Sequence, residues 1–220
     1  MSTLKAICGI DFRENDGIVF LQETVKAQII RDAQEYGGTR ITLTGMLSQA
    51  KIPLQIDIGI GDIITPGPDI INFPTILDLP APTLKAYPRY TVVAEKFEAI
   101  VSLGIANSRM KDFYDIWLLS TLFEFDGEKL SKAIKNTLTR RKTNLPDNLP
   151  VAFTDEFKKD PLKTTQWKAF IRKSKPDKTN GSLDFIINEI EIFLLPILKA
   201  IKTDEQFLKR WKVDKGWIAQ

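Results

Sequence analysis

The spacing of hydrophobic residues changes along the chain and divides it into two parts. Between residues 17 and 60 these residues come in short alternating or continuous runs, which predict β-strands. The strands are expected at residues 17–21, 25–30, 40–47 and 53–60. From residue 90 onward the hydrophobic residues recur every three or four positions, which predicts helices. The helices are expected at residues 90–104, 108–122, 127–138, about 150–158, 161–174 and 182–202.

A proline-rich segment joins the two parts. Six prolines fall between residues 65 and 88, and this density predicts an extended crossing rather than a helix or a strand. The sequence therefore predicts an α+β fold, with a β-sheet region at residues 1–86 and an all-helical domain at residues 87–220.

Polar residues interrupt the first two helices at characteristic places. Gly104 is a typical helix stop, and Asn107 or Ser108 can cap the helix that follows. Glu95 and Lys96 are adjacent and cannot face each other on a helix, so each needs a partner elsewhere.

The second helix begins with a crowded charged block. Lys111 and Asp115 are four residues apart and Asp112 and Asp115 are three apart, so the three side chains share one surface, with Arg109 beside them. Two carboxylates, a lysine and an arginine suit the binding of a metal-chelated phosphate. They equally suit an ion-pair network that holds the helix in place, in which Arg109 pairs with Asp112.

Composition narrows the chemistry that is available. The chain has no histidine and a single cysteine, Cys8, which excludes imidazole catalysis and a cysteine zinc cluster. Metal-assisted phosphoryl or nucleotidyl transfer is the class that works with the remaining side chains, because magnesium prefers carboxylate oxygens. No run of eighteen apolar residues occurs and the first fifteen residues lack an apolar segment, so we expect a cytoplasmic protein without membrane association.

The net charge of +3 is small, but the basic residues are concentrated in one stretch. Residues 129–178 contain fourteen lysine and arginine residues, with Trp167 and Phe170 among them. Such a stretch can bind an RNA backbone and stack on an exposed base. The alternative is a solvated helical surface with both aromatic rings in the core.

Several blocks of the sequence resemble the AbiEii/AbiGii family of toxins, which are nucleotidyltransferase-fold proteins of bacterial abortive-infection and toxin–antitoxin systems. The blocks are YGGTRITLTGML, IPLQIDIGIGD, AYPRYTVVAEKFEAIVSLGIANSRMKDFYDIWLLS and the residues 166–170, QWKAF. The resemblance implies a nucleotidyltransferase-like sheet that uses Mg²⁺ and a nucleoside triphosphate (NTP). It also implies an RNA acceptor, with tRNA expected, and a cognate antitoxin whose direct binding is not assumed.

The resemblance also implies roles for residues of the predicted sheet. In the segment LQIDIGIGD, Asp57 alternates with isoleucines and corresponds to a catalytic carboxylate and metal ligand of the family, with Asp62 as the second choice. The alternative is that Asp57 caps a turn or pairs with an arginine.

Residues of the two charged helices take the remaining roles. By resemblance, Lys96 lies near the phosphates of the nucleotide and Asp112 is catalytic, whereas Arg109, Lys111 and Asp115 bind nucleotide or phosphate. The alternative for Lys96 is a salt bridge with Glu95 or Glu98.

One family feature has no counterpart in this sequence. Members of the family carry a Gly-Gly or Gly-Ser turn followed by an Asp-x-Asp pair, and Gly37-Gly38-Thr39 is followed by no such pair. We therefore expect a chain that begins after the catalytic turn and is inactive by itself. The alternatives are a non-catalytic module that binds nucleotide or RNA, and a purely structural role for the charged clusters.

Overall fold

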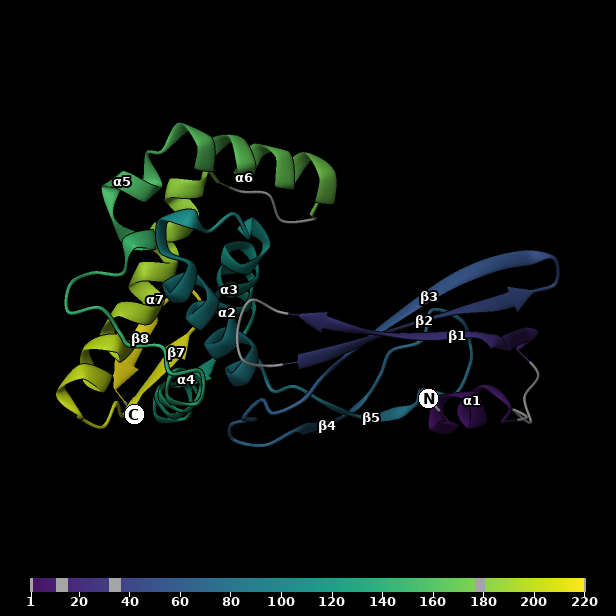
Figure 1. Cartoon of the computed structure of the whole chain (residues 1–220). Helices are drawn as coiled ribbons and strands as arrows, with labels where there is room; N and C mark the ends of the chain where they lie inside the picture. The colour runs from purple at the N-terminus through teal and green to yellow at the C-terminus, as the bar shows by residue number, and fades with distance from the viewer. Residues whose placement is uncertain (1, 11–15, 32–36, 177–180, 220) are drawn as a thin grey trace. The chain divides into compact units, whose positions relative to one another are not determined.

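The predicted strands form one antiparallel sheet in the computed structural model, which describes residues 2–10, 16–31, 37–176 and 181–219. Its strands β1 (Ile18–Arg31), β2 (Gly37–Leu47) and β3 (Ala50–Gly59) lie in the order β1-β2-β3 (Figure 1). The two strands expected at residues 17–21 and 25–30 are the halves of β1. The pairing register with β2 shifts between Leu21 and Lys26, so an irregularity separates these halves.

Alternation gives this sheet one apolar and one polar face. Ile41 pairs with Ile56 and Leu43 with Leu54 across β2 and β3, whereas Arg40 pairs with Asp57 on the opposite face. A short helix, α1 (Ser2–Cys8), packs on the apolar face and was not predicted. The sheet and α1 belong to a first compact unit, residues 1–62.

The second unit starts earlier than the helical domain that the sequence predicted. The chain divides after Asp62 instead of at residue 86. The reason is Thr65, whose backbone N–H donates to Thr91 Oγ1 and whose side-chain oxygen accepts from Asn136 Nδ2, both at 3.0 Å. The proline-rich segment is also more ordered than a crossing, because it contains the hairpin β4 (Asp69–Asn72) and β5 (Thr83–Ala86).

Helices make up most of the second unit. They are α2 (Arg89–Leu103), α3 (Met110–Leu122), α4 (Gly127–Arg140), α5 (Asp155–Lys158), α6 (Pro161–Ser174) and α7 (Leu183–Thr203), with the 3₁₀ turns η1 (Gly104–Ala106) and η2 (Val151–Phe153). The predicted helices are confirmed to within two residues at each end, except that the segment 150–158 is η2 followed by α5.

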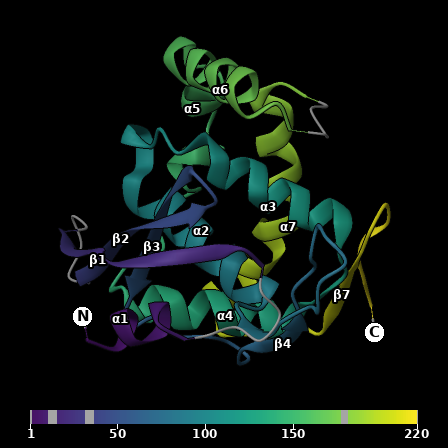
Figure 2. The same cartoon turned by 90° about the vertical axis from the view of Figure 1, so that its right-hand side faces the viewer.

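Helix α7 forms the centre of this unit. Its residues Ile187, Ile190 and Phe193 are fully buried, and Figure 2 shows α3 beside it, with α2 packed against α3. Among the described residues, no helix is both long enough and apolar enough to cross a membrane.

A small sheet that the sequence did not predict closes one side of the second unit. Its strands are β6 (Phe125–Asp126), β7 (Lys209–Lys212) and β8 (Gly216–Ala219). Trp211 donates its ring N–H to the carbonyl oxygen of Ser120 at 2.7 Å, and Trp217 donates to that of Phe193 at 2.8 Å. The two indoles thereby bind the end of the chain to α3 and α7.

A buried carboxylate joins α2 to the end of α4. Glu98 is fully buried, and it accepts hydrogen bonds from Arg141 Nη1 at 2.8 Å and Thr143 Oγ1 at 2.6 Å. A buried carboxylate is tolerated only when it is paired and hydrogen-bonded, so this contact braces the two helices.

The Glu98→Ala variant should lower the free energy of unfolding by about 3 kcal/mol, because Arg141 and Thr143 lose their shared acceptor inside the protein. Urea denaturation measures this change. Lys159→Ala is the control, since it removes an exposed ion pair with Asp155 and should leave stability essentially unchanged. Equal losses in the two variants would contradict a bracing role for Glu98.

Candidate functional site

The candidate site lies where α2 and α3 face each other. Lys96 of α2 extends its Nζ atom to within 2.9 Å of Asp112 Oδ1 and 2.7 Å of Asp115 Oδ2, both on α3. The Lys96 side chain is 20% exposed and that of Asp112 is 4% exposed. A largely buried ammonium group therefore lies between two carboxylates.

Two further cations lie on the outer side of this pair. Arg109 Nε is 2.8 Å from Asp112 Oδ2, and Lys111 Nζ is 2.5 Å from Asp115 Oδ2. Both cationic side chains are mainly exposed, at 59% and 70%. Although Arg109 is close to Asp112 Oδ2, that oxygen accepts no aligned hydrogen bond from a described residue, so the contact is an ion pair only. The cluster has three cations for two carboxylates.

The loop between α2 and α3 sets the position of Arg109. Gly104 ends α2 with a φ of +51°, which confirms the predicted stop. Asn107 is fully buried, and its side-chain oxygen accepts from the backbone N–H of Arg109 at 2.7 Å. Asn107 thus caps the turn that leads into α3, and the helix itself begins at Met110.

Lys163 of α6 supports this loop and was not predicted as a site residue. Its Nζ atom donates to the carbonyl oxygen of Asn107 at 2.8 Å and lies 5.2 Å from the centre of the Phe157 ring. Lys163 is 4% exposed. A signal was present in the sequence, since Lys163, Trp167 and Ile171 recur every four residues and share the inward side of α6.

The ion pairs control the protonation of Lys96. Burial lowers the pKa of Lys96, but hydrogen bonds to Asp115 and Asp112 raise it by more, so the pKa lies above its ordinary value of 10.5. Lys96 is therefore charged throughout the physiological pH range and provides a permanent positive charge at the site.

Asp57, the predicted metal ligand, lies on β3 in the first unit. Arg40 binds it with both ends of its guanidinium, Nε to Oδ1 and Nη2 to Oδ2, each at 2.8 Å. The hydrogen bond from Arg40 holds the pKa of Asp57 below its ordinary value. Pairing with an arginine was the alternative considered for this residue, and the structure has that pairing. Asp62 follows β3 at the end of the same unit.

The acidic residues that the structure describes are not grouped as a magnesium site would require. No group of three histidine, cysteine, aspartate or glutamate side chains in the described part of the chain is placed to hold a metal ion. Asp57, Asp112 and Asp115 are each engaged by cationic side chains. The residues that the structure describes therefore do not fit a metal held by the protein alone.

The aromatic residues of the basic stretch are not available for stacking on a base. Trp167 is buried and donates its ring N–H to the carbonyl oxygen of Gly181 at 3.2 Å. Phe170 packs against Tyr114, with 5.7 Å between the ring centres. Trp167 thus belongs to the core, as the alternative interpretation had it, and Phe170 packs against the core partly buried. Lys178 of this stretch lies outside the described residues.

A protein-family model described as "Nucleotidyl transferase AbiEii toxin, Type IV TA system" matches residues 2–189 of the chain. The chain belongs to the AbiEii family. The match confirms the family resemblance and the expected α+β fold, and it includes every residue of the candidate site. No curated protein sequence matches the chain. The family is one of nucleotidyl transferase toxins of type IV toxin–antitoxin systems.

The Lys96→Met substitution should lower the free energy of unfolding by about 2–3 kcal/mol at pH 7, because Asp112 is left buried without its ammonium partner. The raised pKa of Lys96 means that the folded protein retains this proton more strongly than the unfolded chain. The stabilisation is thus complete well below pH 10.5 and is lost as the pH rises through the raised pKa.

Thermal melting at a series of pH values measures this dependence. The difference in melting temperature between the original protein and the Lys96→Met variant should stay constant from about pH 7 to 9 and become smaller above pH 10.5. Lys111→Met is the matched control, since it removes an exposed lysine that shares Asp115, and its effect should be much smaller. A Lys96→Met effect no larger than the control would show that the buried pair does not stabilise the fold.

Proposed function

We propose that the chain acts as a nucleotidyl-transfer toxin that takes a nucleoside triphosphate and attaches its nucleotide to an RNA acceptor, with tRNA as the expected acceptor. In this reaction a hydroxyl oxygen of the RNA forms a bond to the α-phosphorus. The bond from that phosphorus to the bridging oxygen breaks, pyrophosphate leaves, and the hydroxyl proton passes to water. The family supports the reaction class, and the charge of the site supports the substrate class. The missing Asp-x-Asp pair supports the opposite outcome, a chain that is inactive by itself, and the labelling experiment below decides between the two.

The observation that carries the proposal is the excess of cations over carboxylates at the start of α3. Among the described residues, Lys96, Arg109 and Lys111 form ion pairs with Asp112 and Asp115, so three positive charges face two negative charges. A triphosphate suits this place, because Arg109 and Lys111 are exposed and can move from the carboxylates to phosphate oxygens.

In this proposal, Lys96 and Asp112 have positioning roles. Lys96 is charged and largely buried, so it keeps Asp112 and Asp115 in place while the outer cations change partners. Magnesium, which the family resemblance implies, would arrive with the triphosphate, since the described residues do not hold it by themselves. A cognate antitoxin, a role in phage defence and a cytoplasmic location belong to the same proposal.

A second candidate function is a module that binds nucleotide or RNA without transferring a nucleotide. The observation that favours it is the pairing of both predicted catalytic carboxylates with a cation, Asp57 with Arg40 and Asp112 with Lys96. Such a module would bind triphosphates through the same cations and release them unchanged.

Calorimetric titration with magnesium salts of the four ribonucleoside triphosphates tests the phosphate site. The double variant Arg109→Gln/Lys111→Gln should bind at least about tenfold more weakly, since two exposed charge-assisted contacts are lost. The control is Lys129→Gln/Lys132→Gln, which makes the same change of charge on the exposed side of α4. Equal affinities for the two double variants would overturn the assignment of the phosphate site.

A second measurement separates the two candidate functions. The original protein is incubated with α-³²P-labelled triphosphates and unfractionated tRNA, and the label in RNA is counted. Labelled RNA that depends on Arg109 and Lys111 is the expected result. Binding of triphosphates without formation of labelled RNA would contradict nucleotidyl transfer and support the non-catalytic binding module.

A further inference from the structure

Helix α6 carries a strongly one-sided charge. From Pro161 to Pro176 the sequence contains five cationic residues and no acidic residue. These are Lys163, Lys168, Arg172, Lys173 and Lys175. Cations near the end of a helix are favoured by the helix dipole, but the dipole accounts only for those in the last turn.

The outer cations of α6 differ from those just before the helix in having no carboxylate partner among the residues that the structure describes. In α5, Lys158 lies 2.6 Å from Glu191, and the following residue, Lys159, lies 2.8 Å from Asp155. By contrast, no carboxylate of the described residues lies within ion-pair distance of the four outer cations of α6, all of which are exposed. Their charge is therefore available to an external anion.

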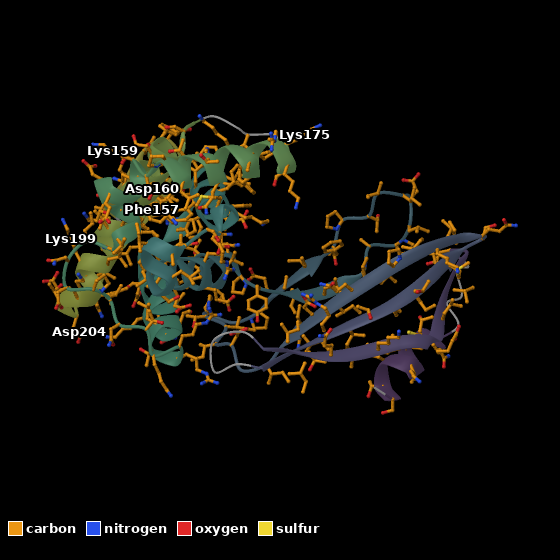
Figure 3. The ribbon with its side chains drawn as sticks, turned by 45° about the horizontal axis from the view of Figure 1, so that its top comes forward. Phe157, Lys159, Asp160, Lys175, Lys199 and Asp204 are labelled. Atoms are coloured by element: carbon orange, nitrogen blue, oxygen red, sulfur yellow. The ribbon has the colours of Figure 1, made fainter. Side chains whose placement is uncertain are left out.

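The positions of these cations favour a polyanion over a single small anion. Lys168 and Arg172 are one helical turn apart, and Lys175 follows at the end of the helix (Figure 3). The exposed cations from Lys168 to Lys175 extend over roughly 10 Å of the helix axis, at 1.5 Å per residue. A row of charges of this length can contact neighbouring phosphates of a nucleic-acid strand.

One end of this row is attached to the candidate site. Lys163 donates to the carbonyl oxygen of Asn107, and Asn107 in turn binds the backbone N–H of Arg109. Figure 3 shows Phe157 and Asp160 near the start of α6, and Lys163 lies over the ring of Phe157. The exposed cations thus begin about one and a half turns from the loop that carries Arg109 and extend away from it.

The apolar residues of α6 argue against a lipid surface as the partner. A helix that binds a membrane exposes large apolar side chains between its cations. In α6 the ring of Trp167 is buried, and Phe170 and Ile171 are partly buried against the core. The one exposed large apolar side chain of α6 is Leu162, at 60%, which lies in the first turn and not between the exposed cations. A groove of about 360 Å³ beside the helix is lined by Lys168 and Arg172 and by the residues 181–183.

We infer that the exposed cationic side of α6, formed by Lys168, Arg172 and Lys175, binds the phosphate backbone of the RNA acceptor and directs the strand toward Arg109. The inference rests on the proposed function for the identity of the acceptor as RNA. Trp167 is buried, so its ring does not stack on a base. The surface therefore contacts phosphates and binds RNA independently of the base sequence.

The test measures RNA binding without nucleotide or turnover, by the fluorescence anisotropy of labelled unfractionated tRNA. The variant Lys168→Gln/Arg172→Gln/Lys175→Gln should bind at least about tenfold more weakly near 100 mM salt. The slope of log affinity against log salt concentration should decrease in magnitude by about 2, since each lost phosphate contact to a single strand removes about 0.7 from it. Melting should be unchanged, because all three side chains are exposed.

The matched control is Lys129→Gln/Lys132→Gln/Lys199→Gln, which removes three exposed lysines from α4 and α7. Its affinity for tRNA should fall less than about threefold, from the change in net charge alone. Equal losses in the two triple variants would overturn the inference. Stronger binding of the original protein to vesicles of phosphatidylcholine and phosphatidylserine than to tRNA would also overturn it, in favour of a membrane surface.

The outcome is separable from that of the proposed function. If tRNA binding depends on α6 and no labelled RNA forms, the RNA-binding surface is supported and the proposed nucleotidyl transfer is wrong. If labelled RNA forms and the α6 variant binds tRNA as the control does, nucleotidyl transfer stands and the surface is wrong.

Discussion

The arrangement of the candidate site depends on one buried ammonium group between two carboxylates. Transfer of these charges out of water costs several kcal/mol for each ion, and their attraction offsets the cost only while all three groups keep their geometry. Lys96 therefore fixes the distance between α2 and α3, and with it the direction of the first turn of α3. Arg109 and Lys111 flank the same two aspartates, so their positions follow from this contact.

The same constraint explains where charges are paired in the second unit. Glu98 is fully buried and has two donors, and Lys158 is 9% exposed and has Glu191. Lys163 is the exception, since the structure gives it a carbonyl oxygen and an aromatic ring in place of a described carboxylate. The outer cations of α6 have no carboxylate partner among the described residues, and because they are exposed, water compensates them. A surface of this kind is stable by itself and remains free to bind phosphates.

Hydrophobic periodicity predicted the helices well because each of them buries a continuous stripe, and Gly104 marked a real helix end. The elements that were missed are those without such a stripe: the seven-residue α1, the hairpin of β4 and β5 within the prolines, and the short strands β6, β7 and β8. Spacing along one helix showed that Arg109 could pair with Asp112. It could not show that Lys96 pairs with Asp112, sixteen residues away, because that contact depends on how two helices pack.

The cluster at α3 can both stabilise the fold and bind a ligand, because its two layers differ in how strongly they are held. The inner layer is Lys96 with Asp112 and Asp115, and the outer layer is Arg109 and Lys111. An exposed ion pair contributes only about 0–1 kcal/mol, so Arg109 and Lys111 can leave their carboxylates for a phosphate at little cost. The Lys96 contacts are largely buried, and breaking them would leave a carboxylate without compensation. The inner layer therefore preserves the geometry while the outer layer changes partners. This division allows the same five residues to stabilise the fold and to receive an anion.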